Sequence, residues 1–287
     1  MITVFTPTYN RCDTLKRLYK SLLNQNCKDF CWLIVDDGSA DDTQKLVSKW
    51  IDENKISIRY YRQENQGKPA AHNKGVELTE TELFTCVDSD DYLVSNAIEK
   101  ISETWRKTQK EDIVGILAFK GYSETKAVTN IKNNINKGNL RFLYDNGLSG
   151  DAMLVFKTDI IKKYSFPKFE NEKFIPEAYL YDLIDQEGSL FVLKEILYIC
   201  EYLPGGYSAN MAKLLYNNPQ GYFCYINQRL KFDENFRQRF FDSVRYTAMA
   251  IAHKKEKFVK NSVYPFISFL SLPFGYILYL IKYKKFR

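Results

Sequence analysis

The sequence predicts an α/β fold in which a mostly parallel sheet is flanked by helices. Short apolar runs alternate with amphipathic segments over the first 120 residues, and polar clusters directly follow several of these runs. The chain has 287 residues, of which 45% are hydrophobic and 26% are charged. This composition excludes a disordered chain and a polytopic membrane protein, and the length suffices for one large α/β domain with appendages or for two small domains.

Each expected element follows from its pattern of apolar residues. The run at 2–6 predicts a strand, and Asp13 is expected to cap the next helix, in which Leu15, Leu18 and Leu22 repeat at helical spacing. The same alternation predicts strands at 31–35, 56–62 and 83–87, and helices that begin near Thr43 and span 70–80. Repeated units of this length build a parallel sheet.

The second half of the chain has a weaker pattern and no internal repeat. Residues 123–143 are rich in Asn and Lys and predict a loop or an insertion. Beyond them we expect strands at 153–157, 190–193 and 196–202, and helical segments at 176–186 and 219–257.

Histidine and cysteine usage limits the chemistry. The two histidines, His72 and His253, exclude a multi-histidine metal site. Six cysteines are spread along the chain without the paired spacing of a zinc site. The N-terminus lacks the basic and apolar regions of a secretory signal, so we expect reduced thiols in a cytosolic protein.

Polar clusters stand where an open α/β sheet binds its ligands. Thr6-Pro7-Thr8, Asp36-Asp37 and Asp88-Ser89-Asp90 each follow the carboxyl end of an expected strand, and these ends meet at one edge of a sheet. The strongest cluster, Asp88-Ser89-Asp90-Asp91, offers carboxylates to Mg²⁺ or Mn²⁺, which prefer oxygen ligands. The alternative is a turn in which Ser89 or Asp91 caps the next helix.

Two other segments suit a nucleotide. A carboxylate after the second strand accepts a hydrogen bond from a pyrimidine N3–H, and Gly38 lets the backbone approach closely. Alternatively, Ser39 or Asp41 caps the following helix, and both interpretations hold together. Lys68 stands near the start of an expected helix, which suits an anion, whereas His72 is expected to be a hydrogen-bonding helix residue. The glycine motifs of dinucleotide and P-loop sites are absent.

Four motifs follow one another in the first 120 residues. They are Pro7-Thr8-Tyr9-Asn10-Arg11, Val35-Asp36-Asp37-Gly38-Ser39 with Asp41, Gln66-Gly67-Lys68 with Asn73-Lys74-Gly75, and Asp88-Ser89-Asp90-Asp91. In order and spacing they resemble the motifs of family 2 glycosyltransferases. The resemblance implies the GT-A fold and an inverting transfer from a nucleotide sugar, most often a UDP-sugar, with Mg²⁺ or Mn²⁺ on the diphosphate.

The resemblance also implies roles for residues at matching positions. Asp90 would be the principal metal ligand, and Asp88 would reach the ribose or the metal. The residues implied to bind the nucleotide sugar are Thr6, Pro7, Tyr9, Arg11, Asp37, Lys68, Asn73, Asp88 and Ser89. We expect a catalytic domain over 1–210, made of a nucleotide-sugar half over 1–120 and an acceptor half over 121–210, then a helical extension over 211–260 and a tail over 261–287.

The family usually places its general base in an acidic motif, often Glu-Asp, at the start of a later helix. Here Glu177 follows Pro176, and Ala178 stands where the Asp is expected. We expect Glu177 to be the base, with Glu172 and Asp151 as reserves. The alternative role for Glu177 is that of an acid in the first turn of a helix, stabilised by the helix dipole.

The expected acceptor is a glycan or a polyprenyl-linked glycan, as in bacterial surface-polysaccharide synthesis. Two alternatives stay open. One is a non-catalytic member that binds a nucleotide sugar or glycan, which Ala178 allows. The other is a sugar-phosphate nucleotidyltransferase, whose Gly-rich basic loop after the first strand is absent here. Nucleic-acid binding is not expected, because the basic residues form no patch in the first domain.

The surplus positive charge brackets an apolar tail. The net charge is +6, and residues 251–287 contain eight Lys and Arg against one acidic residue. Residues 261–281 carry no charge and approach the ~20 residues that span a bilayer, but Pro265, Pro273 and Gly275 interrupt them. We expect a peripheral or monotopic segment at the cytoplasmic face of the cell membrane. The alternative is an apolar hairpin that packs on the domain or on a dimer partner, so a homo-oligomer stays open.

Overall fold

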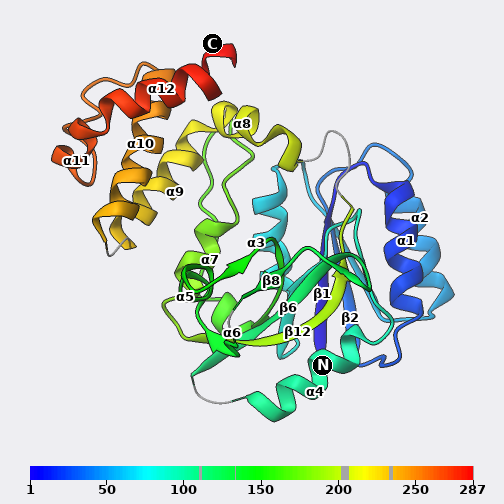
Figure 1. Cartoon of the computed structure of the whole chain (residues 1–287). Coiled ribbons are helices and arrows are strands. Elements are labelled where there is room, and N and C mark those ends of the chain that lie inside the picture. Colours follow the sequence, from blue (N-terminus) through cyan, green and yellow to red (C-terminus); the bar gives the residue numbers. More distant parts are fainter. Residues whose placement is uncertain (110–111, 133, 202–206, 233–234, 287) are drawn as a thin grey trace. The chain divides into compact units, whose positions relative to one another are not determined.

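The computed structural model describes residues 1–109, 112–132, 134–201, 207–232 and 235–286, with only the backbone at 207–209. The chain divides into two compact units, each described here by itself (Figure 1). Unit 1 comprises Met1–Ser165 and Leu180–Glu201, and unit 2 comprises Phe166–Tyr179 and Tyr202–Arg287. The domain boundaries expected after residues 120, 210 and 260 stay a prediction, because compactness does not test a functional boundary.

Unit 1 is built on one large sheet. Its strands are β1 (Ile2–Thr8), β2 (Phe30–Asp36), β3 (Ile58–Arg62), β4 (Leu83–Cys86), β5 (Tyr92–Leu93), β6 (Ile113–Ser123), β7 (Lys126–Ala127), β9 (Lys137–Gly138), β11 (Ala152–Lys157) and β12 (Ser189–Ile199). A separate two-stranded sheet contains β8 (Asn130–Ile131) and β10 (Leu148–Ser149). The helices are α1 (Cys12–Leu23), α2 (Thr43–Glu53), α3 (Lys68–Leu78), α4 (Ala97–Thr108), α5 (Leu140–Asp145), α6 (Thr158–Ile161) and α7 (Ala178–Ile184), whose first two residues count with unit 2.

The strand order in the large sheet is β3-β2-β1-β4-β11-β6-β12-β5. β1 runs parallel to β2 and β4, and β6 runs parallel to β12, whereas β11 runs antiparallel to both β4 and β6. Ala152 at the start of β11 pairs with Phe119 near the end of β6. The start of β11 and the carboxyl ends of β1, β2, β4, β6 and β12 therefore share one edge of the sheet, called the site edge below.

Alternate residues of β1 face opposite helical layers. Val4 lies in the main core with residues of α1, α2 and α4, where the rings of Tyr19 and Trp50 stack with centroids 4.2 Å apart. Phe5 lies on the other face and contacts His72 of α3 edge-on. Burial on both faces is why these strands are near-continuous apolar runs.

The elements expected in the first 100 residues are present close to their predicted bounds, but the helix caps differ. The cap expected from Asp13 is wrong: Arg11 holds the N-cap position of α1 without a side-chain cap hydrogen bond, and Asp13 lies in the first turn. The cap considered for Ser39 or Asp41 is wrong as well, because Asp42 holds the N-cap position of α2 without a side-chain cap hydrogen bond. The Asp41 carboxylate instead accepts a local hydrogen bond from the N–H of Thr43 at 3.1 Å.

The second half differs more from the prediction. Neither α4 nor β6 was among the predicted elements, although Ile113–Phe119 is an apolar run of the kind that forms a buried strand. The expected loop at 123–143 contains β7, β8 and β9. The strands expected at 190–193 and 196–202 are one strand, β12, because register shifts keep it paired with β6 across the irregular segment.

Unit 2 is helical. Its helices are α8 (Tyr207–Asn217), α9 (Pro219–Phe232), α10 (Phe236–Ala252), α11 (Pro265–Leu270), α12 (Leu272–Lys282) and the 3-10 helix η1 (Lys284–Phe286). Their buried core includes Ile226, Tyr246, Met249 and Tyr279. In the part of the chain that the structure describes, no helix combines the length and the hydropathy needed to cross a membrane. The apolar tail instead forms two short helices that meet at Ser271.

Candidate functional site

Two loops at the site edge are joined by hydrogen bonds. The loop after β1 holds the loop after β2, since the N–H of Asn10 donates to Ser39 Oγ at 2.8 Å and Asn10 Oδ1 accepts from the N–H of Ala40 at 2.7 Å. The N–H of Cys12 donates to Asp41 Oδ2 at 3.0 Å. Asn10 has a φ of 52°, a left-handed conformation that Asn tolerates better than most residues. These contacts fix the backbone of both loops.

Asp37 attaches a third loop, which follows β3. Its Oδ1 accepts hydrogen bonds from the Gln63 side chain at 2.8 Å and from the N–H of Gln66 at 2.9 Å, and its Oδ2 accepts from the N–H of Gly67 at 2.7 Å. A carboxylate offers about four acceptor positions, so these contacts leave Oδ2 able to accept one more hydrogen bond. Asp37 therefore has a structural role that the sequence did not predict, in addition to the binding role that the family resemblance implies.

The turn after β4 contains three carboxylates in different surroundings. Asp91 is buried; its Oδ2 accepts from the Tyr198 hydroxyl at 2.6 Å and its Oδ1 from the N–H of Glu201 at 3.0 Å. The Tyr198 oxygen in turn accepts from the N–H of Asp88 at 3.0 Å. Burial raises the pKa of Asp91 to about 6, although the Tyr198 hydrogen bond opposes this. Asp91 thus ties the turn to β12, and the cap considered for this turn is wrong, because Asn96 holds the N-cap position of α4.

Asp88 lies among cations. Its Oδ1 is 2.6 Å from Nζ of Lys68 at the start of α3. Burial alone would raise the pKa of the Asp88 carboxyl, but the charges of Lys68, Lys120 and Arg11 outweigh burial and hold that pKa below its usual range. Lys120 of β6 also lies over the ring of Tyr198, with Nζ 4.2 Å from the ring centroid. The site edge therefore combines an ionised carboxylate with cations that suit a diphosphate.

Asp90 is the least engaged carboxylate of the turn. Its Oδ2 lies 3.9 Å from the Arg11 guanidinium, which is a long ion pair, and its side chain is 22% exposed. Its backbone carbonyl accepts a hydrogen bond from Arg17, which also pairs with Glu201 and lies over the ring of Tyr92. Arg17 thus fixes the backbone of Asp90 while the carboxylate stays accessible to a ligand.

The donor set of this turn fits a hard divalent cation that takes most of its ligands from elsewhere. Asp88 and Asp90 supply carboxylate oxygens, which Mg²⁺ and Mn²⁺ prefer. Among the residues that the structure describes, no group of three or more His, Cys, Asp or Glu side chains is arranged to hold a metal ion. An ion here would complete its coordination with phosphate oxygens and water, as Mg²⁺ commonly does.

The other residues implied to bind a nucleotide sugar differ in exposure. Thr6 is fully buried, and its hydroxyl accepts a hydrogen bond from the Trp32 indole N–H at 2.9 Å. Thr8, two residues further along β1, has a buried hydroxyl without a hydrogen-bond partner among the described residues. Tyr9 is 48% exposed, and Asn73 is half-buried on α3. Pro7 and Ser89 are also buried.

His72 is a core residue of unit 1, and the cysteines form no disulfide. His72 is buried and contacts the rings of Phe5 and Phe84 edge-on, with centroids 5.6 and 5.5 Å away. It is thus a core residue between α3 and the sheet rather than a catalytic one. All six cysteines are free, as predicted.

Sequence reasoning missed three residues at the site edge. Lys120 lies on a strand that was not predicted, Tyr198 lies on a strand whose neighbours were unknown, and Arg17 has the exposed spacing of an ordinary helix-surface residue. The available signal was that Lys120 follows an apolar run, as the acidic clusters do, whereas Tyr198 lies inside one and gave no such signal. Only the strand order brings them beside the turn after β4.

The two candidate bases of unit 2 have different surroundings. Glu172 accepts hydrogen bonds from the N–H groups of Gln220 at 2.8 Å and Gly221 at 2.9 Å, so both its carboxylate oxygens serve the start of α9. Glu177 is half-buried and directly precedes α7, at the helix start that the sequence predicts.

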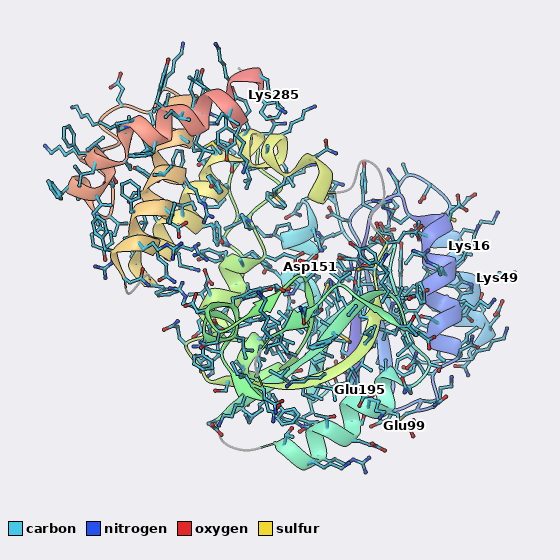
Figure 2. The ribbon with its side chains drawn as sticks, in the orientation of Figure 1. Lys16, Lys49, Glu99, Asp151, Glu195 and Lys285 are labelled. Atoms are coloured by element: carbon cyan, nitrogen blue, oxygen red, sulfur yellow. The ribbon has the colours of Figure 1, made fainter. Side chains whose placement is uncertain are left out.

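The third candidate, Asp151, lies in unit 1. It directly precedes β11 and therefore belongs to the site edge (Figure 2). After burial, which is the main cause, the charges of Asp91 and Asp151 both raise the pKa of the Cys200 thiol. The two carboxylates thus lie near the same side chain, which sequence spacing did not indicate.

A mostly parallel α/β sheet with charged side chains at the carboxyl ends of its strands belongs to the class of open α/β folds that bind ligands at that edge. Within that class, the chain belongs to glycosyl transferase family 2, whose family model matches residues 3–165.

Two curated relatives are similar over part of their length. The GalNAc(5)-diNAcBac-PP-undecaprenol beta-1,3-glucosyltransferase of Campylobacter jejuni is 26% identical over 197 residues, which are 67% of this chain and 62% of that protein. An uncharacterized glycosyltransferase of Haemophilus influenzae is 32% identical over 100 residues, which are 35% of this chain and 40% of that protein. The matches therefore span less than two thirds of these relatives.

Solved structures share the fold. Staphylococcus aureus TarS 1–349 in complex with UDP-GlcNAc has a TM-score of 0.63 at 16% identity, covering 100% of this chain and 92% of that one. The mannosyltransferase PcManGT of Pyrobaculum calidifontis, in complex with GDP-Man and Mn²⁺, has a TM-score of 0.51 at 11% identity, covering 99% and 88%. The predicted fold is confirmed as a GT-A-like α/β fold with a C-terminal helical region.

Proposed function

We propose that this protein transfers a sugar from a UDP-sugar to a hydroxyl of a lipid-linked or polysaccharide acceptor, with inversion at the anomeric carbon and with Mn²⁺ or Mg²⁺ as cofactor. The observation that carries the proposal is the unequal engagement of the turn after β4. Asp91 fixes the turn through Tyr198, and Asp90 keeps an accessible carboxylate beside Arg11. This is what a site needs to hold a metal–diphosphate group.

The relatives support the proposed donor, metal, acceptor and location. TarS was solved with UDP-GlcNAc, which supports a UDP-sugar donor, and PcManGT was solved with Mn²⁺, which supports the metal. The name of the C. jejuni relative specifies a saccharide on undecaprenol diphosphate, which supports a lipid-linked acceptor. An acceptor of that kind supports a location at the cytoplasmic face of the membrane, peripheral or monotopic.

The residues of the site edge have distinct tasks in this reaction. Lys68, Lys120 and Arg11 hold the diphosphate oxygens, and the free acceptor position of Asp37 suits the N3–H of uracil. Asp88 is placed to reach the ribose or the metal. A divalent cation held by Asp90 supplies stabilisation of the charge that develops on the departing diphosphate.

The acceptor hydroxyl attacks the anomeric carbon from the face opposite the diphosphate, and the bond between that carbon and the diphosphate oxygen breaks. A carboxylate takes the proton of the attacking hydroxyl, so the configuration inverts without a covalent intermediate. We propose Glu177 as this base, with Asp151 as the second candidate because it lies at the site edge. Glu172 is not proposed, since its two oxygens are engaged at the start of α9.

Asp90→Asn tests the metal and the reaction class. UDP release from a panel of UDP-sugars with Mn²⁺ should fall by about 10³-fold or more, since a Lewis acid contributes several kcal/mol to such steps. Binding of UDP without metal should persist in a thermal-shift assay. Asp52→Asn, on the exposed side of α2, is the matched control and should keep full activity. Full activity of Asp90→Asn would contradict the proposed ligand.

Glu177→Gln and Asp151→Asn together test the base. Glu177→Gln should keep donor binding and lose transfer by about 10²–10⁴-fold, the range of general base catalysis. Glu170→Gln, a nearby exposed residue, is the control. If only Asp151→Asn loses transfer, the base is Asp151.

The same assays separate the two alternative functions. A non-catalytic member would bind the UDP-sugar without releasing UDP from any donor or acceptor tried. A sugar-phosphate nucleotidyltransferase would release pyrophosphate from a nucleoside triphosphate and a sugar phosphate. UDP formation that depends on an acceptor hydroxyl is expected here and excludes both.

A further inference from the structure

Helices α11 and α12 of unit 2 bury their small and polar residues against α10. Ser268 and Ser271 are fully buried, and Ser271 Oγ lies 2.9 Å from Thr247 Oγ1 of α10. Gly275 lies at the same contact, where a Cβ atom would come within 2.5 Å of Thr247 Cγ2. The helices therefore approach α10 closely at Ser, Gly and Thr residues.

Most large apolar residues of the same two helices are exposed, although Ile267 and Tyr279 are buried. Phe266 is 72% exposed and Ile281 is 74% exposed. The exposed set on α11 and α12 is Phe266, Phe269, Leu270, Phe274, Tyr276, Ile277, Leu280 and Ile281. A surface helix in water shows the reverse pattern, with its apolar stripe toward the core. Small residues at helix contacts and large apolar residues outside are typical of helices surrounded by lipid.

This surface continues onto α10. The ring of Phe240 contacts that of Phe274, with centroids 5.4 Å apart, and also stacks on Phe236. Phe236 and Phe241 are 60% and 52% exposed. The outward residues of α11 and α12 together with Phe236 and Phe241 are called the apolar face below. Exposed apolar surfaces of this kind mark an interaction site on a folded protein.

The charges around the apolar face identify its partner. Residues 202–287 contain fourteen Lys and Arg against four Asp and Glu. Exposed lysines stand on both sides of α11 and α12 in the chain: Lys254, Lys255, Lys257 and Lys260 before them, and Lys284 and Lys285 after them (Lys285 is labelled in Figure 2). A second copy of the chain would bring two strongly basic surfaces together, whereas an anionic lipid surface is complementary in charge.

We propose that the apolar face inserts into the boundary between headgroups and acyl chains of an anionic bilayer, with the flanking lysines on lipid phosphates. α11 and α12 have 6 and 11 residues, so they lie in the plane of the interface. This inference rests on the membrane location in the proposed function and deepens it by naming the surface and the lipid class. It does not require the transfer reaction.

Co-sedimentation of the full chain with vesicles tests the inference. Binding is expected with vesicles of phosphatidylcholine plus phosphatidylglycerol, should weaken in high salt, and should be weak with phosphatidylcholine alone. Phe266→Ser with Ile281→Ser should lower binding by about tenfold or more, because two large apolar side chains no longer leave water. Ile51→Ser with Phe142→Ser, on the surface of unit 1, is the matched control and should change nothing.

Two further variants separate insertion from charge attraction. Lys260→Gln with Lys284→Gln and Lys285→Gln should weaken binding to the anionic vesicles and reduce its dependence on salt. The fluorescence of the tryptophan introduced by Phe269→Trp should be quenched by brominated lipid. The fluorescence of the tryptophan introduced by Ile51→Trp, and of the three native tryptophans, which are buried in unit 1, should not be quenched.

Two results would overturn the inference. One is vesicle binding that the Phe266 and Ile281 substitutions do not change. The other is a dimer in solution that those substitutions dissociate, with no vesicle binding. Asp90→Asn should bind vesicles as the unmodified chain does. Vesicle binding without UDP release from any donor would therefore refute the proposed function alone, and transfer without vesicle binding would refute the apolar face alone.

Discussion

Unit 1 and the last two helices of unit 2 distribute apolar side chains in opposite ways. In unit 1 the sheet buries its apolar residues between helical layers and gathers its charges at one edge, where carboxylates face cations and N–H donors. In α11 and α12 the Ser and Gly residues lie inside, whereas the Phe side chains, Ile277 and Ile281 lie outside. In unit 1 the fold itself buries the apolar side chains, whereas the apolar face of unit 2 is buried only when a partner binds. A break in the usual burial pattern thus locates a binding surface that has no catalytic motif.

The largest effect on stability is expected at Asp242 in unit 2. This carboxylate is 1% exposed and accepts from Arg229 Nε at 2.7 Å and from Arg245 at 2.6 Å. Asp242→Asn leaves the partly buried Arg229 without its counter-charge and should lower the free energy of unfolding of unit 2 by about 3–5 kcal/mol. Glu256→Gln, an exposed change, is the control.

The measurement for Asp242→Asn uses the distribution of tryptophan. All three tryptophans lie in unit 1, so their fluorescence reports that unit during urea unfolding, whereas circular dichroism reports the helices of both. We expect a circular dichroism transition at lower urea and an unchanged fluorescence transition. Equal shifts of the circular dichroism and fluorescence transitions would mean that the two units unfold together, which would contradict their treatment as separate units.

The next effect compares two glycines at helix contacts, one in each unit. A Cβ atom on Gly75 would lie 2.3 Å from Phe5 Cε2, and one on Gly275 would lie 2.5 Å from Thr247 Cγ2. Gly→Ala at either position should cost about 1–3 kcal/mol by overpacking, offset in part by the better helix propensity of Ala, worth about 1 kcal/mol.

Steady-state kinetics distinguishes the two glycine variants. Gly75→Ala displaces α3, which carries Lys68, so the KM for the donor should rise. Gly275→Ala should leave that KM unchanged and weaken vesicle binding. A donor KM that responds to Gly275→Ala alone would reverse the roles given to the two units.

A smaller effect on stability distinguishes a structural residue of β1 from a binding residue of the same strand. Thr6→Val leaves the buried Trp32 N–H without its acceptor and should cost about 1–2 kcal/mol of unfolding free energy, with the donor KM unchanged. Thr8→Val is the matched change: its hydroxyl has no partner among the described residues, so stability should hold. A rise in KM for Thr6→Val would instead support the binding role that the family resemblance implies.

The smallest effect is on pH dependence, through Asp185 in unit 1. Its oxygens accept from the N–H groups of Leu140 and Arg141 at 2.8 Å each, yet burial raises its pKa to about 6 from 3.8. The folded state therefore binds this proton more tightly than the unfolded state, and stability falls as pH rises between those values. From about pH 5 to pH 7 the loss should be about 1 kcal/mol.

Urea unfolding followed by tryptophan fluorescence at both pH values measures this loss. Asp185→Asn should remove the contribution of Asp185 to the change in unfolding free energy with pH. Asp159→Asn, at an exposed residue, should leave that change as it is in the unmodified chain. An unchanged slope in Asp185→Asn would show that another group titrates.

Local patterns predicted the first four parallel strands because each is buried on both faces and ends in a polar loop. They could not predict that β11 would enter between β4 and β6, since that order depends on pairing between residues far apart in the chain. Lys120 and Tyr198 reach the turn after β4 only through this order, so the acidic half of the site was predicted and part of its basic and aromatic surroundings was not.

Hydropathy likewise predicted an apolar tail but not its orientation. Which face of α12 is buried depends on the fit of Gly275 and Ser271 against Thr247, a residue on another helix. Periodicity alone would place the large apolar residues inward.

Exchanging the loops of the candidate site between relatives would have to preserve the hydrogen bonds at the site edge. Asn10 binds the loop after β2 through Ser39 and Ala40, and Asp37 binds the loop after β3 through Gln66 and Gly67. A graft of the loop after β2 alone would leave the other two loops without their partners, and a graft of either other loop would leave the loop after β2 without one of its partners. The three segments therefore form one cassette, and a chimaera with altered donor choice should exchange them as a block.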